Sequence, residues 1–200
     1  MSHGRFDNPV IASLAGFSDR FRKQDNELRF SEKERFGGKN CLITGANSGL
    51  GHALAVEMAR RGARVVMANR TRSEEALHKA RRASGSPLIE QWFVDLSEIS
   101  TVYAFADRMA SEGFHPDVTI LNAGVALPKP RKTSSGQDEM FQVNYLSNVI
   151  LTNLMVEKGI IPANCNGTFL PRIIFISSDS HQGCSAIDYS EFGRDRKSVV

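Results

Sequence analysis

Short apolar runs alternate with longer amphipathic stretches from Lys39 onward. The apolar runs are compact and end in small or polar residues, which is typical of strands buried in a parallel sheet. We expect these strands at Asn40–Thr44, Arg64–Ala68, Ile89–Val94, Asp117–Leu121 and Arg172–Ile176. Helical spacing between them predicts helices at Gly49–Arg61, in a charged stretch ending at Arg82, at Ser97–Glu112 and at Gln137–Lys158.

This alternation predicts βαβ units, whose right-handed crossovers place helices on both faces of one sheet. The expected fold class is therefore α/β, a doubly wound parallel sheet with strand order 3-2-1-4-5. Residues 1–38 form a polar N-terminal extension punctuated by phenylalanines, ahead of the domain at 39–194. Ser31 and Glu34 have the spacing of a helix capping box, so we expect a short helix or two docking on the domain. A partner-binding arm is the alternative.

Composition and net charge indicate which classes of protein the chain can belong to. With 41% hydrophobic and 24% charged residues, the chain matches an ordinary globular protein. The net charge of +3 is small and the basic residues are scattered, which speaks against nucleic-acid binding.

No apolar run approaches the roughly 20 residues of a transmembrane helix. The histidines show no metal-ligand spacing, so no metal site is expected. Cys41, Cys165 and Cys184 lack a disulfide spacing, and no signal peptide is seen, so the expected location is cytoplasmic.

A glycine-rich segment, Thr44-Gly-Ala-Asn-Ser-Gly-Leu-Gly51, joins the first predicted strand to the first predicted helix. Glycine there permits a tight turn and close approach of the backbone to a ligand, and the helix N-terminus favours a pyrophosphate. Glycines alone are weak evidence, because many loops use them for positive φ. The strand before and the helix after predict a dinucleotide site. Its expected binding residues are Thr44, Gly45, Asn47, Ser48, Gly49, Leu50 and Gly51.

Four further motifs follow in order. Asp95-Leu96 closes the third predicted strand, and Asn122-Ala-Gly124 closes the fourth. Asn144 lies in the long predicted helix, and Ser178 follows the fifth strand. With the T-G-x-x-x-G-x-G turn, these motifs resemble the short-chain dehydrogenase/reductase family over roughly residues 38–192. Within it, the chain resembles the branch of retinol dehydrogenases and protochlorophyllide reductases.

The resemblance implies an NAD(P)-binding Rossmann fold and a set of residue roles. Asp95 and Leu96 would contact the adenine, while Asn122, Ala123 and Gly124 would line the cofactor cleft. As catalytic residues, Ser178 would hydrogen-bond the substrate oxygen and Asn144 would help to hold a proton-relay water. The implied reaction is hydride transfer between a nicotinamide and an alcohol or carbonyl carbon of a small molecule. The sequence does not identify that molecule, and self-association of a full-length protein stays open.

The second predicted strand ends near Asn69-Arg70, without the carboxylate that NAD-selective domains place there. Arg70 could pair with the 2′-phosphate of NADP in a charge-assisted contact. We therefore expect Asn69 and Arg70 to favour NADP(H), with NAD(H) as the alternative cofactor. The competing interpretation is that Arg70 is only a solvated loop residue.

The resemblance also implies a Tyr-x-x-x-Lys pair, in which lysine lowers the pKa of the proton-donating tyrosine. Neither Tyr103, Tyr145 nor Tyr189 is followed by lysine at that spacing. We expect the chain to stop before this pair and before the C-terminal strands, inside an insertion that 182–193 resembles. Residues 195–200 match the translation of a sequencing-library adapter, so we expect a non-native tail there, with a natural basic terminus as the alternative.

These observations predict an NAD(P)(H)-dependent oxidoreductase whose displayed fragment is inactive. The alternative function is a non-catalytic Rossmann module that binds a dinucleotide as a sensor or scaffold. Asn144 and Ser178 argue against the alternative, because a pure binding module has no need of them.

Overall fold

The computed structural model describes residues 35–161 and 170–178. The chain divides into two compact units, Glu34–Ile176 and a second unit made of Met1–Lys33 with Ser177–Val200. Of the second unit, only Ser177 and Ser178 are described, so the fold below is that of the first unit. The predicted N-terminal helices, the 182–193 insertion and the 195–200 tail lie outside the described residues.

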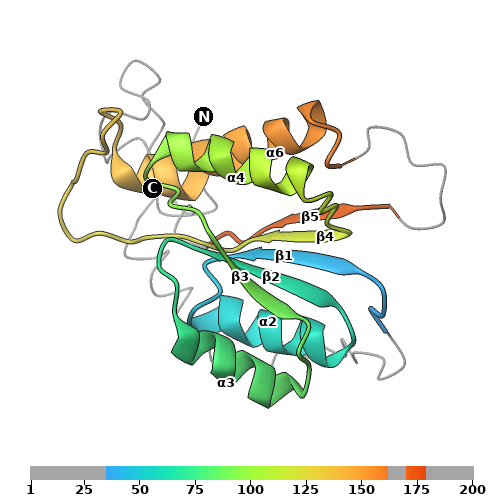
Figure 1. The fold of residues 1–200 in the computed structure, drawn as a ribbon. Coiled ribbons are helices and arrows are strands. Elements are labelled where there is room, and N and C mark those ends of the chain that lie inside the picture. The colour runs from blue at the N-terminus through green and yellow to red at the C-terminus, as the bar shows by residue number, and fades with distance from the viewer. Residues whose placement is uncertain (1–34, 162–169, 179–200) are drawn as a thin grey trace, which may run out of the picture. The chain divides into compact units, whose positions relative to one another are not determined.

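A parallel sheet forms the centre of this unit, with strand order β3-β2-β1-β4-β5 (Figure 1). Every pair of neighbouring strands is parallel. The predicted fold class and strand order are confirmed. The strands are β1 (Asn40–Thr44), β2 (Arg64–Asn69), β3 (Ile89–Phe93), β4 (Val118–Leu121) and β5 (Arg172–Phe175).

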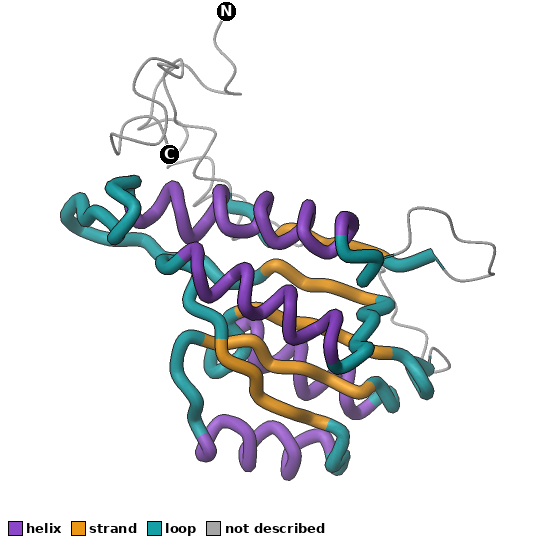
Figure 2. The backbone as a smooth tube through the Cα atoms, turned by 45° about the horizontal axis from the view of Figure 1, so that its top comes forward, coloured by secondary structure: helices purple, strands orange, loops and turns teal. Residues whose placement is uncertain are grey.

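Helices cover both faces of the sheet, as right-handed crossovers require. Helices α2 (Gly49–Arg60) and α3 (Glu74–Ser84) lie on one face. Helices α4 (Ile99–Ser111) and α6 (Ser147–Glu157) lie on the other (Figure 2). No helix in the described part of the chain is both long and apolar enough to cross a membrane.

Alternate residues of the central strands face two separate hydrophobic cores. In β1, Leu42 belongs to the core on the α4 side, whereas Cys41 and Ile43 belong to the core on the α2 side. All three are fully buried. Burying an aliphatic side chain of this size contributes about 1.5–3 kcal/mol, so these apolar runs explain why the segments form central strands.

The segment predicted as a single helix at Gln137–Lys158 differs from the prediction. It begins with the short helix α5 (Glu139–Phe141), widens into the π-helical turn η1 (Gln142–Leu146) and continues as α6. The Asn148 amide donates to the carbonyls of Val143 and Asn144, at 3.4 and 3.1 Å. These bonds satisfy carbonyl groups of the widened turn, which apolar spacing alone does not reveal.

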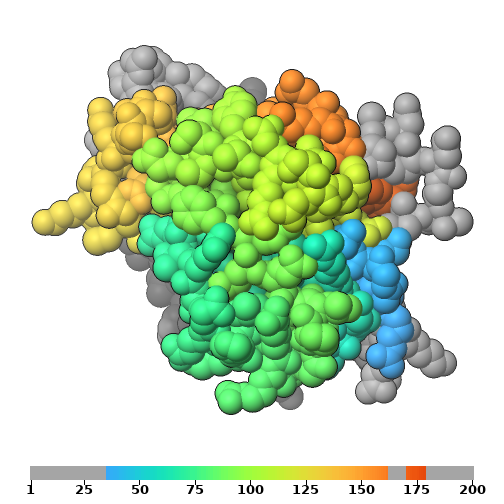
Figure 3. Space-filling model, viewed as in Figure 1, coloured from blue at the N-terminus to red at the C-terminus, as the bar shows by residue number. Residues whose placement is uncertain are grey.

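Two peripheral features complete the fold. The connection from β4 to α5 projects beside α4 (yellow in Figures 1 and 3). Strand β5 is exposed, because among the described strands it pairs only with β4. The side chains of Ile174 and Phe175 are consequently accessible, at 43% and 53%.

Candidate functional site

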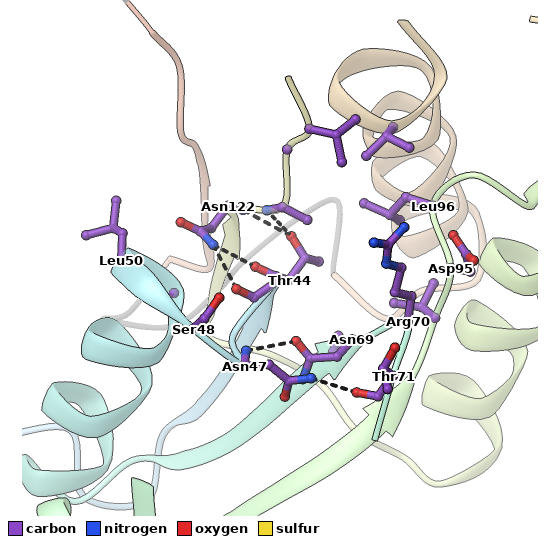
Figure 4. Close-up of a pocket in the computed structure, with 18 residues that line it drawn as sticks. Thr44, Asn47, Ser48, Leu50, Asn69, Arg70, Thr71, Asp95, Leu96 and Asn122 are labelled. Carbon is purple, nitrogen blue, oxygen red and sulfur yellow. Dashed lines mark hydrogen bonds between the residues drawn. The ribbon is translucent and has the colours of Figure 1, made fainter. Parts of the chain in front are cut away.

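A pocket of about 410 Å³ opens at the carboxyl ends of β1, β2, β3 and β4 (Figure 4). Ligands of open α/β sheets bind at this edge. Every residue predicted to bind the cofactor lines it except Gly49, while Ala68, Thr71, Val94, Val125 and Val143 are additional. The predicted residues in the wall are Thr44, Gly45, Asn47, Ser48, Leu50, Gly51, Asn69, Arg70, Asp95, Leu96, Asn122, Ala123 and Gly124.

Two glycines of the turn have no room for a side chain. Gly45 has φ +68°, and a Cβ added there would come within 2.9 Å of the Ala123 Cα. A Cβ on Gly51 would overlap the Gly45 carbonyl oxygen and the Asn122 amide nitrogen. The turn therefore packs backbone against backbone, which leaves its outer surface free for close approach by a ligand. Gly49 has φ +55° and begins α2 without lining the pocket.

Thr44 joins the glycine turn to the end of β4. Its buried hydroxyl oxygen accepts the backbone N–H groups of Asn122 and Ala123, both at 3.0 Å. In return, the Asn122 side-chain amide donates to the carbonyls of Thr44 and Gly45, at 3.0 and 3.2 Å (Figure 4). The two strand ends that form one wall of the pocket are thus held at a fixed separation.

Helix α2 begins at this wall and offers a site for an anion. Its N-cap Ser48 makes no capping hydrogen bond with its side chain. The first-turn N–H groups and the positive end of the helix dipole therefore remain available to a negatively charged ligand. Together with the glycine packing, this arrangement fits the pyrophosphate of a dinucleotide.

At the end of β2, Asn69 is buried and Arg70 is exposed. The Asn69 side-chain oxygen Oδ1 accepts the backbone N–H of Asn47 at 3.1 Å. Arg70 makes no hydrogen bond or ion pair with the rest of the described residues, and its side chain extends toward Leu96 (Figure 4). Among the described lining residues, Asp95 is the one carboxylate, and its Oδ1 accepts both the N–H and the hydroxyl of Ser97.

Gln142, which the sequence pattern did not single out, holds the Leu96–Ser97 segment at the far wall of the pocket through hydrogen bonds to its carbonyls. It is fully buried in η1, and its amide nitrogen donates to the Ser97 carbonyl at 2.6 Å. Its amide oxygen accepts the hydroxyls of Thr133 and Ser135, at 2.7 and 2.6 Å. The one signal in the sequence was a polar residue among apolar positions of a predicted helix. Its hydrogen-bond partners lie in two other loops, so local spacing could not predict them.

The two predicted catalytic residues lie in different compact units of the chain. Asn144 is exposed in η1 and pairs with the backbone of Val125, accepting its N–H at 2.8 Å and donating to its carbonyl at 2.9 Å. It does not line the pocket directly, although Val125 does. Ser178 follows β5 in the chain and belongs to the second compact unit. The catalytic roles of Asn144 and Ser178 stay predictions.

Among the described residues, neither a cluster of metal-ligating side chains nor a reactive thiol lies at this pocket. The described residues contain no group of three or more His, Cys, Asp or Glu side chains that could hold a metal ion. Burial raises the pKa of the Cys41 thiol from its ordinary value of 9.0 to about 12. Cys41 therefore stays protonated near neutral pH and is a core residue of β1.

Comparison with known proteins decides the family. The model of the short chain dehydrogenase family matches residues 39–187. The chain belongs to the short-chain dehydrogenase family. Human retinol dehydrogenase 14 is 38% identical to this chain over 156 residues, which cover 70% of this chain and 45% of the human protein. Mouse retinol dehydrogenase 12 is 36% identical over 148 residues, covering 72% and 44%. The predicted family and its retinol dehydrogenase branch are confirmed.

Solved structures of other proteins share the fold of this chain. A protein of Mycobacterium paratuberculosis is 38% identical with a TM-score of 0.52, covering 60% of this chain and 42% of that one. A metagenomic short-chain oxidoreductase in complex with NADP is 28% identical with a TM-score of 0.51, covering 62% and 57%. The chain spans less than half the length of the curated relatives it matches.

Proposed function

We propose that this short-chain dehydrogenase is an NADP(H)-preferring oxidoreductase that acts on an alcohol/carbonyl pair. The observation that carries the proposal is the pocket itself. It combines a glycine turn without space for side chains, a helix N-terminus without a side-chain cap, and Arg70 at the end of β2, which has no partner among the described residues. The complex of a related oxidoreductase with NADP supports the same cofactor.

In this proposal each part of the pocket has one task. The α2 N-terminus and the glycine turn bind the pyrophosphate, and Arg70 pairs with the 2′-phosphate. Asp95 and Leu96 bound the adenine side, where Ser97 orients the Asp95 carboxylate. The bound nicotinamide supplies the hydride chemistry. Asn144 holds the Val125 segment at the nicotinamide end of the pocket.

Proton delivery requires groups beyond those described. We assign it to a tyrosine and lysine pair outside residues 1–200, with Ser178 orienting the substrate oxygen. General acid–base catalysis contributes about 10²- to 10⁴-fold, so residues 1–200 alone are expected to give no measurable carbonyl reduction. If they did reduce a carbonyl, Tyr189, which lies outside the described residues, would be the first proton donor to test, by Tyr189→Phe.

The decisive experiment uses the full-length protein encoded by the gene. Retinaldehyde is the first substrate to test, because relatives of this chain are named retinol dehydrogenases. NADPH oxidation is followed by absorbance, and the alcohol product is measured independently. Formation of alcohol in step with NADPH oxidation supports the proposal, and a small polar aldehyde tests substrate class.

A second outcome would favour the non-catalytic alternative. That module would bind NADPH, seen as enhanced nicotinamide fluorescence, but would oxidise it with no aldehyde or ketone in a broad panel. Absence of both binding and turnover would contradict the oxidoreductase and the binding module alike.

A further inference from the structure

Gln91 lies on β3, outside the pocket wall, yet its side chain contacts the glycine turn, which forms part of that wall, and Ser73 at the start of α3 (Glu74–Ser84). Its register partner in the sheet is Met67 of β2. The Gln91 amide nitrogen donates to the Asn47 side-chain oxygen at 3.0 Å and to the Ser73 carbonyl at 2.9 Å. Its amide oxygen accepts the Ser73 N–H at 2.9 Å. These side-chain hydrogen bonds therefore converge on the glycine turn and the start of α3.

Ser73 is the N-cap of α3, and its hydroxyl accepts the Ala76 N–H at 3.2 Å. Gln91 thus hydrogen-bonds both the backbone N–H and the backbone carbonyl of Ser73, the residue at which the β2–α3 loop ends. At the beginning of the loop, Asn47 holds Asn69 through its backbone N–H. The Asn47 side chain also donates to the Thr71 carbonyl at 2.7 Å (Figure 4).

These contacts surround Arg70 without touching it. Asn69 and Thr71, its two neighbours in the chain, are both held by Asn47, and Asn47 is itself held by Gln91. The loop backbone around Arg70 is consequently ordered before a ligand arrives. Ordering a loop in advance removes an entropy cost that would otherwise oppose binding.

We propose that Gln91 is a positioning residue that sets the preference for NADP(H) by holding the loop that carries Arg70. This inference rests on the proposed assignment of Arg70 to the 2′-phosphate. Because Gln91 acts on the loop that meets the adenosine ribose, its loss affects binding of NADPH much more than binding of NADH, which lacks that phosphate.

The test is Gln91→Met in the full-length protein, since methionine keeps the length of the side chain and removes its hydrogen bonds. Dissociation constants for NADPH and NADH are measured by nicotinamide fluorescence. The NADPH constant is expected to rise about tenfold, equivalent to about 1.4 kcal/mol, while the NADH constant changes much less. Glu90→Gln is the matched control, because Glu90 is adjacent on β3 but bonds Arg64 and Trp92 away from the pocket.

A double-mutant cycle with Arg70→Ala separates positioning from general stability. If Gln91 acts through Arg70, Gln91→Met has no further effect on cofactor preference in the Arg70→Ala protein. Equal weakening of NADPH and NADH by Gln91→Met, or the same effect with and without Arg70, overturns the inference while leaving the oxidoreductase proposal intact. A wild-type protein without NADPH preference overturns the Arg70 assignment and this inference together.

Thermal unfolding verifies that the variant is folded. Should Gln91→Met not fold, Gln91→Glu provides the measurement, because its carboxylate still accepts the Ser73 N–H but donates to neither Asn47 nor Ser73. The same loss of NADPH preference supports the inference, and retained preference contradicts it.

Discussion

At the scale of single residues, charge placement distinguishes two arginines in one loop. Arg70 lines the pocket and Arg72 does not, although both are exposed. A cation at the end of the second strand, in place of a carboxylate, suits a ligand with a phosphate on the ribose. Replacing either arginine with aspartate changes the net charge equally, but only Arg70 lies in the pocket wall. The pair of variants therefore separates a local contact from overall charge.

We expect Arg70→Asp to weaken NADPH binding by about 1–3 kcal/mol, through loss of a charge-assisted contact, and to favour NADH relatively. Arg72→Asp in the same loop should have a much smaller effect. Both constants are measured by fluorescence titration at several salt concentrations, because a phosphate contact weakens with ionic strength. Equal affinity of the unmutated protein for the two cofactors would refute the assignment of Arg70.

Cys41 leads to a prediction about reactivity and pH. It is fully buried, and burial raises the pKa of its thiol to about 12. We expect iodoacetamide to leave Cys41 unmodified in the folded protein at pH 8 and to alkylate it after denaturation, as peptide mass spectrometry would show. The folded pKa lies above the ordinary value of 9.0, so the thiol contributes stability below pH 9.0 that is lost as pH rises toward 12. Modification in the native state at the rate of a free thiol would contradict this.

At the scale of elements, two buried threonines test how the pocket wall is held. The Thr44 hydroxyl accepts two backbone N–H groups from the turn after β4. The hydroxyl of Thr119, buried in β4, has no partner among the described residues. We expect Thr44→Val to lower the free energy of unfolding by about 1–3 kcal/mol, because it leaves two partly buried N–H donors without their acceptor. Thr119→Val should be neutral or stabilising.

Urea denaturation of the two variants provides the measurement, with the slope of each transition checked for two-state behaviour. NADPH affinity should fall only in Thr44→Val, since the strand ends that face the cofactor lose their connection. Equal losses of stability in both variants would show that the Thr44 hydrogen bonds contribute nothing specific.

Local pattern was sufficient to predict the strands and the glycine turn, whereas the strand order was predicted from the fold class. Apolar runs such as Asn40–Thr44 are buried on both faces, so burial and sequence agree there. Long-range partners were not predictable. Gln91 reaches Asn47 only because β3 lies beside β2 in one particular register. The widened turn at Gln142–Leu146 likewise depends on tertiary contacts, which helical periodicity does not contain.

At the scale of the whole molecule, strand β5 departs from the rule that parallel strands are covered on both faces. Its last residues and the one that follows, Ile174, Phe175 and Ile176, are 43%, 53% and 42% exposed. Among the described strands, β5 pairs only with β4, so its outer backbone groups and these apolar side chains lie together at the sheet edge. Such an edge is a site for pairing with other chains.

We therefore expect residues 1–200, expressed alone, to give little soluble protein, and Ile174→Lys to increase the soluble fraction. A lysine at an exposed sheet edge opposes edge-to-edge association through its charge and hydration. Leu88→Lys is the matched control, because Leu88 is 51% exposed in the loop before β3 and receives the same charge. Light scattering against concentration, with the soluble yield, measures the effect. If both lysines improved solubility equally, net charge rather than the β5 edge would be responsible, and a chain that stayed monomeric without either substitution would contradict the edge hypothesis itself.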